Sequence, residues 1–196
     1  EGTNFTGSLL VGHSATGTLS TASNNTGVGI NALEELSTGD DNTALGKGAG
    51  KGISTGSGHV FIGHNAGYNT SGSNDNIGIG DSAFAGQGVN NNSSYNVAIG
   101  SNTMTNSQNA RYNVVIGKDA GTAITTGDNN VLIGADAGDN LTTGEGNVII
   151  GYDIDAAAVD DDRTLIIAGN DGDTTTTWIS GDSSGNIVVA GTTHAA

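Results

Sequence analysis

The sequence predicts an all-β fold, a parallel β-solenoid of about ten coils that are each 17 residues long. Composition is the first reason, because Gly, Thr, Asn and Ser make up half of the 196 residues and all four are poor helix formers. A strict repeat is the second reason, and the alternation of side chains within each repeat is the third. Repeats of this length and composition do not suit helical units, but they suit a coil with two strands.

The repeat is marked by a four-residue pattern of aliphatic residue, any residue, aliphatic residue and glycine. Successive glycines of the pattern lie 17 residues apart, except for one interval of 20 residues. These glycines are Gly12, Gly29, Gly46, Gly63, Gly80, Gly100, Gly117, Gly134 and Gly151. A tenth copy, at 165–168, has Ala168 in place of the glycine. Such a register predicts that equal positions stack on one another in successive coils.

The three residues before each glycine are predicted to form the main strand of the coil. Its first and third residues, such as Val114 and Ile116, are aliphatic in most repeats and share one face, because side chains alternate along a strand. We expect these two positions to form ladders inside the solenoid. The middle residue, such as Val115, faces the other way and is also apolar in most repeats. The second apolar face needs a cover, and another copy of the chain is the simplest one.

Asparagine precedes the strand in seven of the ten repeats, at positions 25, 42, 76, 96, 113, 130 and 147. Stacked asparagines can hydrogen-bond along the stack, so the sequence predicts an amide ladder. After the glycine come a turn, a weaker second segment with a recurring alanine, and a Thr-Gly or Ser-Gly turn in several repeats. We expect a solenoid domain over residues 1–168 and a C-terminal β cap or junction segment over 169–196.

The charge balance argues against several classes of function. The chain has 5 basic and 20 acidic residues and a net charge of −15, whereas binding to nucleic acid or an anionic membrane needs basic patches. No run of 18 apolar residues is present, so we expect no membrane insertion. The lack of cysteine removes thiol chemistry. No catalytic triad or carboxylate pair can be recognised, and we expect a protein that is not an enzyme and has no cofactor.

Four consecutive repeats carry the motif in its clearest form: Asn-Val-Ala-Ile-Gly (96–100), Asn-Val-Val-Ile-Gly (113–117), Asn-Val-Leu-Ile-Gly (130–134) and Asn-Val-Ile-Ile-Gly (147–151). With these motifs the chain resembles two groups of proteins. One is the left-handed parallel β-roll head of trimeric autotransporter adhesins. The other is the repeat stalk of phage tail-fibre-like proteins that carry a C-terminal self-cleaving intramolecular chaperone. The 17-residue spacing and the Asn-Ala-Gly and Asp-Ala-Gly segments (65–67, 119–121 and 136–138) are more similar to the second group.

The resemblance covers nearly the whole chain and implies a left-handed β-roll that assembles as a homotrimer. The segment from Thr164 through Trp178 to Val189 is similar to the junction that precedes such a chaperone. We therefore expect a structural fibre segment, a rigid adhesive or display rod in a virion fibre or an extracellular surface filament. The alternative function is a module that binds a glycan or receptor on a host or cell surface.

The 20-residue interval places a three-residue insertion near residues 85–94, and a loop that departs from a regular rod is a candidate for recognition. Tyr95 and Tyr112 occupy the same position in adjacent coils and would offer aromatic faces to a sugar. The candidate ligand contacts are Gln87, Asn90, Asn91, Asn92, Tyr95 and Tyr112. The other interpretation is a tolerated bulge beside two tyrosines that pack for stability.

Two groups of residues contain metal-ligand types. His59 and His64 bracket the fourth strand, and in a trimer three copies of one histidine can meet on the axis. A surface histidine at a strand end is the simpler interpretation. Asp153, Asp155 and the run 160–162 form an acidic cluster, whose repulsion Ca²⁺ would relieve. Their spacing matches no calcium motif, so we expect solvated charge and no metal there.

Overall fold

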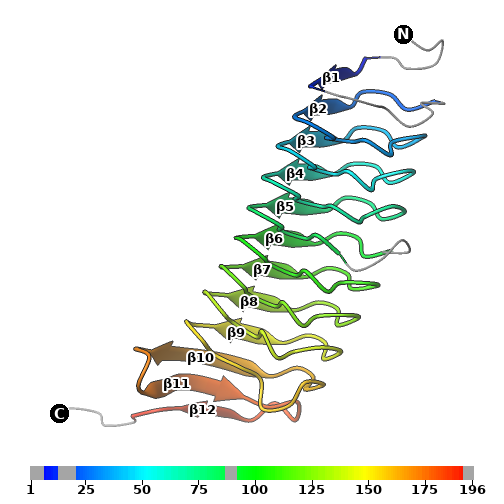
Figure 1. Cartoon of the computed structure of the whole chain (residues 1–196). Helices are drawn as coiled ribbons and strands as arrows, with labels where there is room; N and C mark the ends of the chain where they lie inside the picture. The colour runs from blue at the N-terminus through cyan, green and yellow to red at the C-terminus, as the bar shows by residue number, and fades with distance from the viewer. Residues whose placement is uncertain (1–6, 13–20, 87–91, 192–196) are drawn as a thin grey trace.

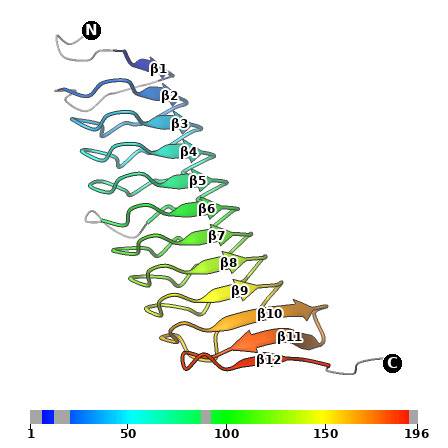
Figure 2. The same cartoon turned by 180° about the vertical axis from the view of Figure 1, so that it is seen from behind.

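The computed structural model describes residues 7–12, 21–86 and 92–191. The regular elements in these ranges are twelve strands, which form one sheet in chain order. The strands stack along one side of the molecule and the turns of the coils lie along the other (Figure 1), as the view from behind also shows (Figure 2). No helix among the described residues has the length and apolar character needed to cross a membrane. The strands are β1 (Leu9–Val11), β2 (Thr26–Val28), β3 (Thr43–Leu45), β4 (Val60–Ile62), β5 (Ile77–Ile79), β6 (Val97–Ile99), β7 (Val114–Ile116), β8 (Val131–Ile133), β9 (Val148–Ile150), β10 (Leu165–Asn170), β11 (Thr175–Gly181) and β12 (Ile187–Val189).

The predicted register of the repeats is confirmed by the strand pairing. β1 to β10 pair in parallel, each with the strand of the next coil, and Val114 of β7 lies beside Val131 of β8. Across the 20-residue interval Ile77 of β5 still lies beside Val97 of β6. The extra residues therefore leave the sheet undisturbed, and the chain is a parallel β-solenoid.

Each coil within the described ranges contains one strand, whereas the sequence analysis predicted two. The segment predicted as the second strand forms turns and bends. In the coil after β7, Asp119 and Gly121 both have a φ of 56° in this segment. Residues in the left-handed region cannot continue an extended strand, so the segment curls back toward the sheet.

The prediction of which strand residues face inward was wrong. The middle residues Val115, Leu132 and Ile149 are fully buried, whereas the flanking Val114 and Ile116 are only half-buried. The rest of each coil curls over the face that carries the middle residues and supplies further apolar side chains to it. The large apolar side chains that come from this curled part are Leu33, Leu36, Ile53, Phe84, Met104, Ile124, Leu141 and Ile154.

The core keeps its packing by exchanging large and small residues between two positions that lie six residues apart. Gly78 of β5 is followed by the large Phe84, whereas Phe61 of β4 is followed by Gly67. A Cβ on Gly67 would overlap the Phe61 ring. The same exchange relates Gly27 to Leu33, Ala98 to Met104, Val115 to Gly121 and Leu132 to Gly138. At these two positions, each of these coils therefore carries one larger and one small residue, so that the side chains fit the same interior space.

Close stacking of the coils requires the glycines that follow the strands. Gly117 has a φ of 146°, and a Cβ at this position would overlap the carbonyl oxygen of Gly134 in the next coil. The equivalent glycines from Gly29 to Gly151 make the same approach to the coil that follows them. Ala168 occupies the last copy of the position, where the antiparallel strand β11 follows instead of another coil. Glycine is not required at this position, because no further coil of the solenoid stacks on it.

An antiparallel extension completes the sheet at its C-terminal end. β10 pairs in parallel with β9 and antiparallel with β11, and β11 pairs antiparallel with β12. Four large apolar side chains of this extension are more than half exposed: Trp178, Ile187, Val188 and Val189. The described part of the chain therefore leaves an apolar surface uncovered here.

Candidate functional site

A ladder of buried asparagines runs along the stack, as the sequence predicted. Oδ1 of Asn113 accepts hydrogen bonds from the backbone N–H and from Nδ2 of Asn130, at 2.9 and 3.0 Å. Nδ2 of Asn130 also donates to the carbonyl oxygen of Gly144, at 2.9 Å. The hydroxyl of Ser8 accepts a bond at one end of the ladder, and Thr164 donates two bonds at the other. Each buried amide is thus satisfied by the adjacent coils, which fixes their register.

His59 takes the place of asparagine in this ladder, and the simpler prediction of a surface histidine was wrong. Its backbone N–H donates to Oδ1 of Asn42, and its Nδ1 accepts from the backbone N–H of Asn76 at 3.2 Å. Nε2 donates to the carbonyl oxygen of Ser73 at 3.0 Å, so the ring must be neutral with its proton on Nε2. Desolvation by burial lowers the pKa of His59 to about 4. The ring stacks on Phe61, with centroids 5.0 Å apart.

His64 lies in a different environment from His59. Its Nδ1 is 2.7 Å from Oδ1 of Asp81 in the next coil, and both side chains are exposed. The structure therefore separates the two histidines that bracket β4. Among the described residues, no group of three His, Asp or Glu side chains could hold a metal ion.

The acidic cluster uses several of its carboxylates to bind the chain itself. Oδ2 of Asp161 accepts from the backbone N–H of Ala158, and Oδ1 of Asp162 accepts from the backbone N–H of Glu145. Asp155 interacts with Asp139, a residue that the sequence analysis did not include. Partial burial and then this contact raise the pKa of Asp139 to about 6, and the charges of Asp136 and Asp153 also contribute.

The structure brings Tyr95 and Tyr112 together and exposes both. Their rings are stacked and nearly parallel, with an interplanar angle of 3° and centroids 5.1 Å apart. Asn92 is exposed near this pair in the chain, and its backbone N–H donates to the carbonyl oxygen of Gln108. Three further candidate contacts, Gln87, Asn90 and Asn91, lie outside the described residues.

Both tyrosines hold an unusual backbone conformation. Tyr95 has a φ of 63° and Tyr112 a φ of 58°, a region that bulky side chains rarely occupy. The equivalent residues of other coils, which also have positive φ, include Asn24, Asp41, Gly58, Asp75 and Asn129. Glycine, asparagine and aspartate tolerate this conformation best. The two tyrosines, together with Arg163 in the last coil, are therefore exceptions to the residue types that the turn favours.

The flanking residues of the strands form a surface that we call the outer aliphatic face, defined as the first and third residues of β1 to β10. Eighteen of these twenty positions are aliphatic, the other two are Thr26 and Thr43, and none is charged. Within the described chain, these side chains are half-buried or exposed, with Leu45 at 49%. The face runs along the whole solenoid on the strand side that Figure 1 displays.

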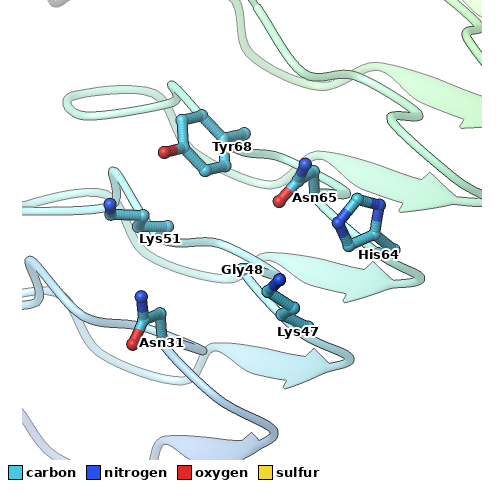
Figure 3. A pocket seen from close by; sticks show the side chains of 7 residues that line it. All are labelled: Asn31, Lys47, Gly48, Lys51, His64, Asn65 and Tyr68. Atoms are coloured by element: carbon cyan, nitrogen blue, oxygen red, sulfur yellow. The ribbon is translucent and has the colours of Figure 1, made fainter. Parts of the chain in front are cut away.

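A small basic pocket, which the sequence analysis did not predict, lies across the turns that follow β2, β3 and β4. We call it the Lys47–Tyr68 pocket (Figure 3). Its volume is about 250 Å³. Its lining residues are Asn31, Lys47, Gly48, Lys51, His64, Asn65 and Tyr68.

Two contacts hold Lys51 in this pocket. Its Nζ is 3.1 Å from Oε2 of Glu34 and 5.3 Å from the ring centroid of Tyr68. Hydrogen bonding to Tyr68 and then to Glu34 raises the pKa of Lys51, so the ammonium group stays charged. Lys47 is exposed and forms no ion pair with any residue in the described ranges.

The repeat itself contained the signal for this pocket. Lys47 and His64 are 17 residues apart, as are Lys51 and Tyr68, so each pair occupies one position in adjacent coils. The spacing predicts which side chains are neighbours but not that the surface is hollow between them. The hollow depends on the turn conformation, which only the structure shows.

Comparison with known proteins gave no match for this chain among family models, curated proteins or solved structures.

Proposed function

We propose that the chain is a structural segment of a homotrimeric fibre, a rigid rod in a virion fibre or an extracellular surface filament. The outer aliphatic face carries the proposal. A continuous apolar surface of this length is unusual on a monomer and is typical of an interface. A structural role uses this surface directly and needs no catalytic group.

A further copy of the same chain is the cover that fits the outer aliphatic face best. The face has no charge although the chain has a net charge of −15, so copies can meet there while their acidic side chains stay in water. Aliphatic residues also recur at equal heights in every coil, which suits copies placed in the same register around a symmetry axis. The number of three copies rests on the resemblance to trimeric fibres and adhesins.

Three features of each coil support a rigid rod. Backbone hydrogen bonds join each strand to the next, the asparagine ladder joins the buried amides, and the glycines allow the coils to approach closely. Interactions between neighbouring repeats make such a stack resist local opening. The stalk of a phage tail-fibre-like protein is the finer proposal. Its support is the 17-residue motif and the similarity of the C-terminal segment to a chaperone junction.

The experiment compares the mass in solution of the parent with two variants that each add one carboxylate. Ile116→Asp places the charge on the outer aliphatic face, and Asn109→Asp places it on an exposed turn. By light scattering, the parent and Asn109→Asp should have three times the chain mass of 19.3 kDa. Ile116→Asp should be smaller, because a buried unpaired charge at an interface is costly.

Val115→Asp tests the face of the same strand that points into the core of the solenoid. This change places the charge in the core, where Val115 is fully buried. We expect it to unfold the chain, which circular dichroism would detect, and not only to dissociate the assembly. A parent that is a monomer at micromolar concentration would contradict the proposed trimer. An unchanged mass for Ile116→Asp would remove the outer aliphatic face from the interface.

Glycan binding is the second candidate function, and the Tyr95–Tyr112 pair is the observation that favours it. Two exposed, stacked aromatic rings, at a turn position that glycine, asparagine or aspartate occupies in most other coils, support a role beyond folding stability. Tyr112→Asn would install the residue type that Asn129 shows at the equivalent position. Its melting temperature should equal or exceed that of the parent, while signals on a glycan array should decrease. A less stable variant with unchanged array signals would show that the pair acts only in packing.

A further inference from the structure

A glycine at the centre of the Lys47–Tyr68 pocket lets two residues of its lining lie close to the backbone. Asn31, Gly48 and Asn65 occupy the same position in three successive coils. Gly48 has a φ of 70°, and a Cβ there would approach Oδ1 of Asn65 and lie 3.6 Å from the Tyr68 ring. The lack of a side chain at Gly48 therefore leaves room for the amide of Asn65 and the ring of Tyr68 to line the pocket from the next coil, and the close-up shows Gly48 between Asn31 and Asn65 (Figure 3).

The charge of the pocket is opposite to that of the chain. The protein has 5 basic residues against 20 acidic ones, and two of the five, Lys47 and Lys51, line this one hollow with His64. Lys51 is paired with Glu34 and His64 with Asp81, whereas Lys47 has no ionic partner among the residues that the structure describes and is the cation left for a ligand. A local positive site on an acidic surface favours a small anionic group over a large polyanion, which the surrounding carboxylates would repel.

The remaining walls offer an aromatic ring and amide groups. Tyr68 forms one wall, and the side chains of Asn31 and Asn65 lie on either side of Gly48 (Figure 3). The C–H face of a sugar ring packs against an aromatic ring, and amides can both donate to and accept from hydroxyl groups. The volume of about 250 Å³ is below the roughly 300–1,000 Å³ that is typical of pockets for drug-sized ligands. It therefore suits one sugar residue.

We propose that the Lys47–Tyr68 pocket binds a single sugar residue that carries a carboxylate, with the carboxylate at Lys47 and the sugar ring against Tyr68. This site would add recognition of an acidic saccharide to the structural role of the rod. The pocket lies within one chain, so the inference does not depend on trimer formation.

The test is a ligand-detected NMR titration of the full chain with glucuronic acid and N-acetylneuraminic acid. Glucose and glucose 6-sulfate serve as neutral and sulfated comparisons. Gly48→Asn adds the residue type of the adjacent coils at a point where its side chain must displace Asn65 and press on Tyr68, and asparagine tolerates the positive φ. Lys47→Met removes the unpaired charge. Lys118→Met is the matched control, because Lys118 occupies the position of Lys47 in another coil and lines no part of this pocket.

At least one of the two acidic sugars should bind the parent and Lys118→Met alike, and that sugar should bind Gly48→Asn and Lys47→Met at least about tenfold more weakly, the loss expected for one charged hydrogen bond. Circular dichroism of each variant would establish that it is folded. The proposal is wrong if neither acidic sugar binds at millimolar concentration, if glucose or only the sulfated sugar binds, or if Gly48→Asn leaves the affinity unchanged. A monomeric parent that binds an acidic sugar would contradict the trimer but support this site.

Discussion

At position 59 a histidine ring makes the hydrogen bonds that an asparagine amide makes in seven other coils. Nδ1 replaces the amide oxygen as acceptor and Nε2 replaces the amide nitrogen as donor. This replacement works only for the neutral ring, since a protonated ring would direct a second N–H at the backbone N–H of Asn76. The substitution therefore introduces a titratable group into a ladder that otherwise has none.

The neutral state of His59 predicts a loss of stability in acid. Its pKa is about 4 in the folded chain and 6.5 ordinarily, so the unfolded chain binds the proton first as the pH falls. The contribution to the free energy of unfolding is complete above pH 6.5 and decreases toward pH 4, by about 3 kcal/mol in total. In His59→Asn this decrease should be absent in denaturant titrations across that range. An equal decrease in the variant and the parent would refute the assignment.

The amide ladder predicts a large effect of a small change at Asn113. Asn113→Ala removes the acceptor of two bonds from Asn130 and a donor to the carbonyl oxygen of Gly127. Unsatisfied buried groups of this kind cost about 1–3 kcal/mol each, so the melting temperature should fall by many degrees. Asn109→Ala, on an exposed turn, should leave it almost unchanged. Similar losses for the two variants would show that the ladder has no special role.

At the glycines that follow the strands, we expect an alanine substitution to destabilise the fold mainly because its Cβ disturbs the stacking of the coils, and less because of the backbone conformation. Gly117→Ala and Gly172→Ala both replace a glycine of positive φ, but a Cβ at Gly172 would have no neighbour within 4 Å. Gly172→Ala should cost about 1 kcal/mol through its backbone alone. Gly117→Ala should cost several times more, because its Cβ would overlap Gly134 in the next coil. Chemical denaturation measures both, and equal costs would contradict the explanation.

The strands show what the sequence could predict and what it could not. The 17-residue register, the strand positions and the asparagine ladder follow from the repeat alone, because parallel stacking places equal positions side by side. The inward direction of Val115 did not follow, since Val114, Val115 and Ile116 are all apolar. The sequence signal that we missed is the complementary size of residues such as Phe61 and Gly67. A large residue at one position is matched by a small residue at the other only where both side chains face the same enclosed core.

The candidate sites were predictable to a lesser degree than the strands. The proximity of Tyr95 and Tyr112 followed from their equal positions in adjacent coils, and their stacking confirms it. The burial of His59 did not follow, because the inward-facing positions had been assigned to the wrong residues. The Lys47–Tyr68 pocket required knowledge of the turns, in which positive φ values direct the side chains.

On the acidic surface, the raised pKa of Asp139 predicts that its ionised carboxylate destabilises the fold. Asp139, with a pKa of about 6 instead of 3.8, contributes stability that is complete below pH 3.8 and lost as the pH rises through 6. Asp139→Asn should therefore raise the melting temperature at pH 7.5, and the gain should shrink at pH 4. Asp75→Asn, at an exposed turn, controls for the change in net charge. A gain that is the same at both pH values would contradict the proposed cause.

The pairing of every coil with only its immediate neighbours makes length an adjustable property of this architecture. Deleting or duplicating any 17 consecutive residues within the regular repeats would leave each surviving position above its equivalent and change the stack by one strand spacing, about 4.8 Å. A deletion of a few residues would instead misalign the asparagines and glycines of every contact it touched. The 20-residue interval marks the exception, because its extra residues leave the pairing of β5 with β6 in place. Genes for such a chain can therefore lengthen or shorten it in fixed increments without changing the chemistry of any single coil.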